Sequence, residues 1–218
     1  IVIAEKYRLD SLLRNGELGD FYRGRHLFID KPVTLNVLPG SLALDEEILG
    51  QFTAEARSAS ALASPHILAV NDFGSNKDQS YYVVYEGFDG EPLKNSIGTG
   101  GQFSVDRAIS IARQIADALN TAHENGFIHG NLTPDTILVS NSVESSSVKV
   151  FDFEPVSTSY HKRSDTKPSI GVAYLAPETF SGLHNVDGRS DIYSLGIILY
   201  QMLAGEVPFK GETPTDVM

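Results

Sequence analysis

The order of apolar and polar positions divides the chain into a strand-rich first part and a helix-rich second part. Alternation in "KYRLDSLL", "GDFYRGRHLF" and "PVTLNVL" predicts three strands, with a turn at Asn15 and Gly16 between the first two. From Asp45 the apolar residues follow a helical period, which ends before Pro65 because the residue preceding proline avoids helical geometry. "ILAVNDFG" and "SYYVVYEG" predict two more strands. We therefore expect a five-stranded antiparallel sheet with one long helix.

The second part contains two strongly patterned helices. Ser104 is a favourable N-cap for "VDRAISIARQIADALNTAHEN", which carries one apolar stripe and ends at Asn125 and Gly126. Two short strands, "TILV" and "VKVF", come next. Residues 154–169 are polar and show no period, and such a segment inside a compact domain is usually functional or disordered. The last helix, "DGRSDIYSLGIILYQMLAG", ends at Gly205.

Composition and charge exclude several kinds of protein. The 218 residues, 41% of them hydrophobic, suit one domain or two lobes with a sizeable core. The absence of Cys excludes disulfides and thiolate metal sites, and no apolar run approaches the roughly 20 residues of a membrane span. The first residues lack the regions of a signal peptide. We expect a cytoplasmic protein, or the cytoplasmic part of a larger membrane-anchored one.

The formal net charge of −11 bears on the partners of the chain. An acidic surface disfavours nucleic acid and anionic membranes. It leaves open a basic peptide as partner, or a charge that only keeps the chain soluble.

Four motifs stand in an order that carries a family resemblance: "FIHGNLTPDTILVS", "FDFE", "GVAYLAPE" and "DGRSDIYSLGIILYQMLAGEVPF". With them, the chain resembles the eukaryotic-like serine/threonine protein kinases of bacteria over about residues 7–209. The resemblance implies an α+β, bilobal protein-kinase-like fold and one kinase-like domain overall. We expect an N-lobe of residues 1–87 with the sheet and its main helix. Residues 88–218 would form a helical C-lobe that lacks the last helices of the family.

The resemblance allows the nucleotide site to be compared position by position, beginning with the phosphate-binding loop. Gly16 and Gly19 match two of the three glycines of that loop, whereas Arg14 replaces the first. Glycines let backbone amides approach phosphate closely. Phe21 replaces the Val that covers adenine, and Glu17 adds negative charge at the tip of the loop. The alternative interpretation of these residues is an ordinary hairpin turn.

The neighbouring strands and the helix also depart from the family. Asn36 replaces the Lys that neutralises phosphate, and Thr34 replaces a small Ala of the adenine pocket. Glu55 matches the helix glutamate that pairs with the Lys, and the apolar stripe predicts that it faces inward. The alternative for Glu55 is an exposed position at the edge of the helix. Tyr85 and Glu86 match the back of the pocket and the start of the hinge.

The catalytic loop of the family corresponds to residues 129–136, called loop 129–136 below. The resemblance implies that Asn131 replaces the general base, Thr133 the Lys and Thr136 the metal-binding Asn. An asparagine has no basic carboxylate oxygen that could accept a proton. Asp135 is close in sequence, but it stands at a variable position that is expected to point away from the chemistry.

The metal motif keeps one carboxylate. Asp152 matches the magnesium-binding Asp, and Leu138 is a further remnant of the nucleotide pocket. A lone carboxylate is a poor Mg²⁺ site without phosphates to share the ion, so a structural turn is the alternative for Asp152. The structural positions of the family, by contrast, are kept, among them His129, Phe153 and Asp191.

These selective losses predict a pseudokinase: a kinase-like domain without catalysis that serves as a binding or regulatory module. The alternatives are an atypical ATP-using kinase or nucleotidyl transferase with a rearranged site, and a purely structural domain of a larger protein. We expect no cofactor, with ATP and Mg²⁺ bound weakly or not at all. The expected partner is a protein: an active kinase that phosphorylates residues 154–169, or a phospho-reader domain that docks there.

Overall fold

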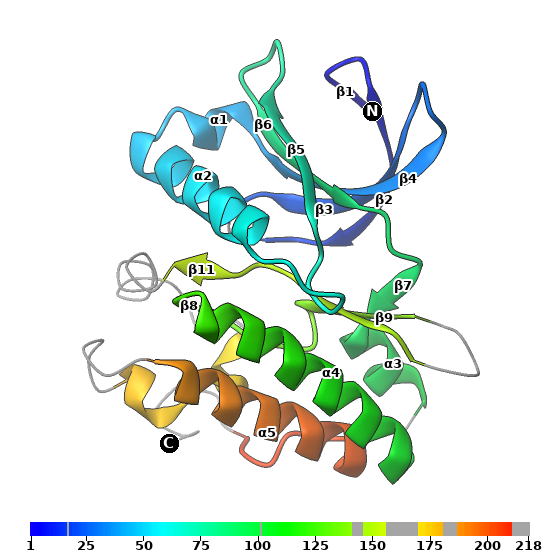
Figure 1. The fold of residues 1–218 in the computed structure, drawn as a ribbon, viewed down its shortest axis with the longest axis vertical. Helices are drawn as coiled ribbons and strands as arrows, with labels where there is room; N and C mark the ends of the chain where they lie inside the picture. The colour runs from blue at the N-terminus through cyan, green and yellow to red at the C-terminus, as the bar shows by residue number, and fades with distance from the viewer. Residues whose placement is uncertain (17, 101, 141–145, 156–169, 181–186, 211–218) are drawn as a thin grey trace. The chain divides into compact units, whose positions relative to one another are not determined.

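The structure is a computed structural model that describes residues 1–16, 18–100, 102–140, 146–155, 170–180 and 187–210 (Figure 1). Backbone contacts divide the chain into two compact units. Unit 1 comprises Ile1–Ala63 and Leu68–Asp89. Unit 2 comprises Ser64–Ile67 and the described residues from Gly90 onward. Ile67 of unit 2 forms a parallel bridge with Val150.

Unit 1 is a six-stranded antiparallel sheet in the order β1-β2-β3-β4-β6-β5, with two helices. Its elements are β1 (Val2–Ile3), β2 (Tyr7–Arg14), β3 (Asp20–His26), β4 (Lys31–Leu38), α1 (Gly40–Ala43), α2 (Glu46–Ala61), β5 (Val70–Ser75) and β6 (Tyr81–Glu86). The predicted five strands are therefore one too few. The additional strand β1 turns back onto β2 through Ala4 and Glu5, which adopt φ of 48° and 58°. Non-glycine residues rarely adopt this conformation, so no turn signal announces it.

The two faces of this sheet carry different side chains, because residues opposite one another on adjacent strands share a face. Phe21 is opposite Asn36, Asn36 is opposite Val83, and Thr34 is opposite Tyr85. We call the face with these five residues the site face. The opposite face carries a hydrophobic cluster that comprises Ile3, Tyr7, Val33, Leu35, Tyr82 and Val84. Strand β4 is thus buried on both faces, as central strands are.

Helix α2 begins at Asp45, whose carboxylate accepts hydrogen bonds from the backbone N–H groups of Glu47 and Ile48. Its buried residues include Phe52, whose ring centroid is 6.1 Å from that of Phe73 on β5. Glu55 is also on the buried side of this helix. The prediction that Glu55 faces inward is therefore confirmed.

Unit 2 is built around two long helices, with short strands and helices beside them. Its elements are β7 (Gly90–Pro92), α3 (Leu93–Gly100), α4 (Val105–Glu124), β8 (Phe127–Ile128), β9 (Ile137–Ser140), β10 (Val148–Val150), β11 (Glu154–Pro155), η1 (Ile170–Tyr174), η2 (Pro177–Phe180) and α5 (Gly188–Ala204). The strands form a sheet in the order β10-β9-β7 and the pair β11-β8. Helix α3 was not predicted, because its sequence "LKNSIGTG" is rich in residues that disfavour helices.

Helices α4 and α5 pack against each other. Helix α4 carries a fully buried apolar stripe: Ala108, Ile111, Ile115, Ala118, Leu119 and Ala122. The predicted caps are confirmed. Ser104 accepts a hydrogen bond from the N–H of Arg107, and α5 ends at Gly205, whose φ is +83°. In the described part of the chain, none of the helices has both the length and the apolar character needed to cross a bilayer. Of the polar segment 154–169, only the two residues of β11 are described.

Candidate functional site

The glycine turn of unit 1 joins β2 to β3, and its own geometry requires both glycines. Gly19 has a φ of +102°, and a Cβ there would lie 2.5 Å from the carbonyl oxygen of Val37. A Cβ on Gly16 would lie 2.4 Å from the carbonyl oxygen of Gly19. Asn15 closes the hairpin by donating from Nδ2 to Asp20 Oδ1 at 2.9 Å. Glu17 lies outside the described residues. A tight hairpin alone thus accounts for the two glycines.

The side chains of the site face are shielded from solvent. Phe21, Thr34 and Tyr85 are 1%, 2% and 4% exposed. The ring centroids of Phe21 and Tyr85 are 6.1 Å apart, with 34° between the ring planes. The guanidinium carbon of Arg14 lies 5.5 Å from the Phe21 ring centroid. The bulk expected from Phe21 and Tyr85 is therefore packed onto the site face, and Leu18 at the turn is buried as well.

Asn36 lies beneath the glycine turn. It is 3% exposed, and its Oδ1 has no hydrogen-bond partner among the described residues. A Cβ on Gly19 would be only 2.7 Å from this oxygen, so the amide packs directly against the turn. A buried acceptor without a donor costs about 1–3 kcal/mol. The position that the resemblance assigns to a phosphate-neutralising Lys thus holds a neutral side chain in a tightly packed place.

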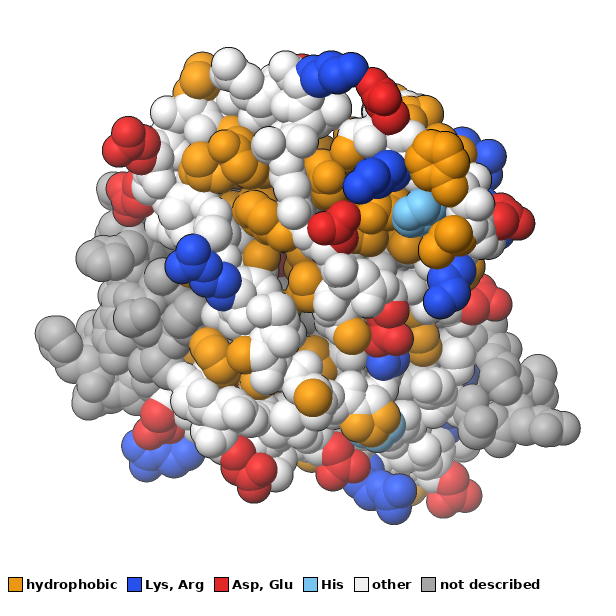
Figure 2. All heavy atoms as spheres, turned by 45° about the horizontal axis from the view of Figure 1, so that its top comes forward, with side chains coloured by type: hydrophobic (Ala, Val, Ile, Leu, Met, Phe, Trp, Pro, Cys, Tyr) orange, Lys and Arg blue, Asp and Glu red, His pale blue; other side chains and the backbone are white. Residues whose placement is uncertain are grey.

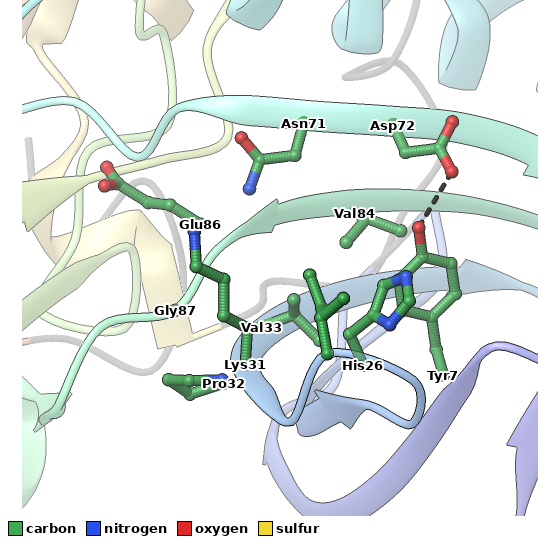
Figure 3. Close-up of a pocket in the computed structure, with 11 residues that line it drawn as sticks. Tyr7, His26, Lys31, Pro32, Val33, Asn71, Asp72, Val84, Glu86 and Gly87 are labelled. Carbon is green, nitrogen blue, oxygen red and sulfur yellow. Dashed lines mark hydrogen bonds between the residues drawn. The ribbon is translucent and has the colours of Figure 1, made fainter.

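A hollow of about 500 Å³ lies on the opposite face of the same sheet (Figure 3). Its floor includes Val33 and Val84, and Glu86 is the only predicted site residue that lines it. Glu86 Oε1 also accepts a hydrogen bond from the N–H of Ala69 at 3.1 Å. Sequence patterns did not reveal this hollow, because its residues come from several strands that only the sheet brings together.

The hollow is bordered by a hydrogen-bonded pair, Tyr7 and Asp72, and by an exposed apolar hairpin tip. Tyr7 donates from its hydroxyl to Asp72 Oδ2 at 2.8 Å, and burial together with this carboxylate raises the pKa of Tyr7. The hairpin tip between β3 and β4 exposes Leu27, Phe28 and Ile29 by 41%, 76% and 62%. Ile29 also lines the hollow. Hydrophobic side chains reach the surface between charged ones on the face that Figure 2 shows.

In loop 129–136 of unit 2, the Thr136 side chain forms hydrogen bonds with the backbone of the same loop. The Thr136 hydroxyl accepts from the N–H of Thr133 at 3.1 Å and donates to the carbonyl of Thr133 at 3.0 Å. Thr136 is 0% exposed and Thr133 is 8% exposed. The N–H of Asn131 lies 3.4 Å from His129 Nδ1. The residue in the place of the metal-binding Asn therefore uses its hydroxyl to close the loop.

Asp135 faces helix α3. Its carboxylate forms an ion pair with the ammonium group of Lys94, and the N–H of Lys94 donates to the carbonyl of Pro134 at 3.2 Å. The side chain of Asp135 is 21% exposed and that of Lys94 is 54% exposed. The one carboxylate within loop 129–136 is thus held by a cation.

Asp191 of α5 anchors the start of loop 129–136. It is 1% exposed and accepts from the N–H groups of His129 and Gly130 at 2.9 and 2.8 Å. It also bonds His123 Nε2 of α4 at 2.7 Å. The rings of His129 and Phe153 are 5.0 Å apart. These three positions, which the resemblance describes as structural, therefore form one buried assembly.

Asp152, the predicted metal remnant, is half-buried between the buried Phe151 and Phe153. Its φ of +74° lies in the left-handed region, which Asp visits more readily than most residues. Leu138 on β9 is 1% exposed and faces Pro92 across the sheet. In the part of the chain that the structure describes, no three His, Asp or Glu side chains gather in a way that could hold a metal ion.

Two polar contacts that join α5 to η1 and η2 were not predicted from the sequence. Ser190 donates from its hydroxyl to Glu178 Oε1 at 2.7 Å. Tyr174 donates to Gln201 Oε1 at 2.7 Å, and burial raises the pKa of Tyr174 to about 12. Each contact joins residues that are separated by more than ten positions, so no local pattern signals it.

The fold is that of a protein kinase domain. The model of the protein kinase domain matches residues 7–218, and the chain belongs to this family. It is a member of the bacterial eukaryotic-like serine/threonine kinases, which confirms the family and fold expected from the sequence.

The relatives are kinases from several bacteria. The chain is 36% identical over 222 residues to serine/threonine-protein kinase PknB of Mycobacterium tuberculosis, covering 99% of this chain and 35% of PknB. It is 34% identical over 220 residues to serine/threonine-protein kinase pkn3 of Myxococcus xanthus, covering 97% of this chain and 40% of pkn3. A probable serine/threonine-protein kinase of Clostridium acetobutylicum is 33% identical over 218 residues, covering 99% and 32%. The chain thus spans between 32% and 40% of the length of these relatives.

Proposed function

We propose that this chain is a catalytically inactive protein-kinase-like domain, a pseudokinase, that acts by binding or regulating a protein partner. Loop 129–136 is the observation that carries the proposal. Asn131 stands in the place of the general base, and the Thr136 hydroxyl is bonded twice to Thr133. The Asp135 carboxylate is paired with Lys94.

The chemistry of phosphoryl transfer explains why these features matter. The reaction needs positioned phosphates, cations that neutralise their charge, and a group that orients the attacking hydroxyl. Loss of a general base typically lowers the rate by about 10²–10⁴. Asn36 carries no positive charge that could neutralise the phosphates. The missing general base and the missing Lys affect the same reaction site, so their effects on the rate cannot be added.

The proposal includes the absence of a nucleotide cofactor. The packed residues Phe21, Thr34 and Tyr85 on the site face support it. Asp152 would be the one remaining ligand for Mg²⁺ in this site. A ligand stabilises a folded protein by RT ln(1 + [L]/Kd), which is about 2.7 kcal/mol at a hundredfold excess over Kd. We expect no change in the melting temperature with millimolar Mg-ATP, and a shift that EDTA reverses would contradict this.

The decisive experiment measures phosphate incorporation from labelled ATP into the chain itself and into a basic protein, first with Mg²⁺ and then with Mn²⁺. We expect none from the wild type. The single variant Asn131→Asp is also expected to be inactive, because the Lys and the metal ligand are still missing. Asp152→Asn is the control: incorporation that survives purification and disappears in this variant would show a working kinase.

A protein partner is the second part of the proposal. Three consecutive exposed apolar residues beside the hollow of unit 1, Leu27–Ile29, support it, since such patches on soluble domains often mark interaction sites. The partner would be an active kinase that phosphorylates residues 154–169 or a phospho-reader that binds them. Mass spectrometry of the native protein tests phosphorylation, and an unmodified segment under all growth conditions would count against it.

The surface is tested by partner capture. Ile29→Ser is expected to reduce capture of a partner by the chain. Leu44→Ser is a matched control, because Leu44 is 75% exposed in the same unit but does not line the hollow. Equal capture by both variants would assign the partner to another surface.

A further inference from the structure

We propose that the hollow of unit 1 binds an arginine side chain from an extended segment of a partner protein (Figure 3). The inference rests on the proposed function, because it names the chemistry by which unit 1 would recognise its partner. All the residues that line the hollow belong to unit 1. Its volume of about 500 Å³ lies within the usual range of ligand-binding pockets.

The charges that line the hollow favour a cation. Asp72 and Glu86 supply two carboxylates, whereas Lys31 supplies one ammonium group. The chain as a whole has a formal net charge of −11. Complementary charges steer partners together and exclude those of the wrong sign. A basic segment of a partner therefore complements both the hollow and the chain.

Asp72 is the carboxylate that we assign to the arginine. It is half-buried on β5, the edge strand of the sheet, and forms no ion pair with any residue that the structure describes. Its Oδ2 accepts from the Tyr7 hydroxyl at 2.8 Å, and its Oδ1 accepts from the N–H of Phe73 at 2.9 Å. Each carboxylate oxygen can accept a second hydrogen bond. The carboxylate is thus held in place and still has room for a cationic donor.

The walls and floor of the hollow favour arginine over lysine. The rings of Tyr7 and His26 both line it and meet edge to face, with centroids 5.0 Å apart. A guanidinium group stacks on aromatic rings and binds a carboxylate through two parallel hydrogen bonds, whereas an ammonium group is a compact point charge. Val33 and Val84 lie at the floor, where the aliphatic stem of an arginine would cover them.

The exposed hairpin tip between β3 and β4 extends the site beyond the hollow. Ile29 lines the hollow and is 62% exposed, and Leu27 and Phe28 precede it at the surface. Exposed apolar patches with polar surroundings mark interaction sites. A partner segment that carries an aliphatic residue next to its arginine would cover the hairpin tip and the hollow together.

The first experiment compares two capped pentapeptides by NMR titration of the ¹⁵N-labelled 218-residue chain. One peptide has an arginine between two leucines, and the other has citrulline in its place, which keeps the shape of arginine without the charge. We expect saturable shifts at the amides of the hollow with the arginine peptide. The citrulline peptide should bind about tenfold more weakly, because its hydrogen bonds are no longer charge-assisted.

The second experiment repeats the titration with two variants of unit 1. Asp72→Asn should weaken binding of the arginine peptide about tenfold and leave binding of the citrulline peptide unchanged. Asp89→Asn is the matched control, because Asp89 is an exposed carboxylate of the same unit that does not line the hollow. This variant should bind both peptides as the wild type does. The comparison of the two peptides on the wild type decides if Asp72→Asn does not fold.

Several results would overturn the inference. Equal affinity for the two peptides, or no saturable binding of either, would show that the hollow does not recognise arginine. Shifts confined to amides outside the hollow would place the peptide elsewhere. Self-association of the chain that sedimentation detects and Asp72→Asn abolishes would assign the hollow to a second copy.

The proposed function is tested separately from this inference. Partner capture that Ile29→Ser reduces, without binding of the arginine peptide, would support the proposed function and overturn the inference. Phosphate incorporation that disappears in Asp152→Asn would instead contradict the proposed function, whatever the peptides show.

Discussion

Thr136 shows how a single hydroxyl completes a loop at the residue scale. Its Oγ1 accepts one hydrogen bond from Thr133 and donates another to it, inside a site that solvent does not reach. The N–H of Thr136 makes a third bond to the carbonyl of Thr133. A side chain without a hydroxyl at this position would leave the buried N–H of Thr133 without this acceptor.

Thr136→Val tests this role, because valine keeps the shape of threonine and removes the hydroxyl. We expect the free energy of unfolding to fall by about 1–3 kcal/mol, since a buried N–H loses its acceptor. Urea denaturation monitored by circular dichroism measures the change. Thr121→Val is the control: the Thr121 hydroxyl bonds only Asp117 O of its own helix, at an exposed place. Equal losses for the two variants would contradict the role assigned to Thr136.

At the scale of elements, α5 organises unit 2 through Asp191. The helix is capped by Asp187, and its first turn presents Asp191 to the backbone of loop 129–136 and to α4. One buried carboxylate thus joins a helix, a loop and a second helix. Charged acceptors form stronger hydrogen bonds than neutral ones, so this junction depends on the carboxylate rather than on the size of the side chain.

Asp191→Asn is expected to lower the free energy of unfolding by roughly 2–4 kcal/mol. The asparagine would place its NH₂ group, which is a donor, against a backbone N–H that now donates to a carboxylate oxygen. Asp187→Asn is the comparison on the same helix. Asn and Asp are nearly equivalent N-caps, so its effect should stay within about 0.5 kcal/mol. Chemical denaturation of both variants tests this, and a small loss for Asp191→Asn would show that the contacts rearrange.

At the scale of the whole molecule, tyrosines in both units make the free energy of unfolding depend on pH in the alkaline range. Burial is the largest cause that raises the pKa of Tyr7, Tyr22 and Tyr82 in unit 1. Burial also raises the pKa of Tyr174 in unit 2 to about 12, with a smaller contribution from Asp135. The folded chain therefore keeps these protons at a pH where the unfolded chain has already released them.

The sign of the effect follows from this difference. A tyrosine whose folded pKa lies above the unfolded value of 10 gives its full contribution below pH 10 and loses it as pH rises through the folded pKa. We expect the free energy of unfolding to fall between pH 10 and 12, by at most about 1.4 kcal/mol per pH unit for each such group. Tyr174→Phe should flatten this dependence. Tyr200→Phe, at a position that is 49% exposed, should leave it unchanged.

The sequence by itself determined the elements whose signals are local. These elements are the helices α4 and α5, with their apolar stripe and caps, and the central strands with their alternation. In each of them the pattern that predicts the element lies within one segment of the chain. The order of the motifs identified the kinase family. The residue types at positions 36, 131 and 136 also established which chemical groups are present there, because folding does not change the chemical group that a side chain carries.

Other features were decided only by the tertiary structure. The hydrogen bond from Tyr7 to Asp72 spans 65 positions, and the ion pair between Lys94 and Asp135 spans 41. The contact of Phe21 with Tyr85 depends on the pairing of β3 with β4 and of β4 with β6. Strand β1 depends on two non-glycine residues with positive φ. A local period shows that a residue is buried, but strand register and helix packing select its neighbour, because they bring distant segments of the chain together.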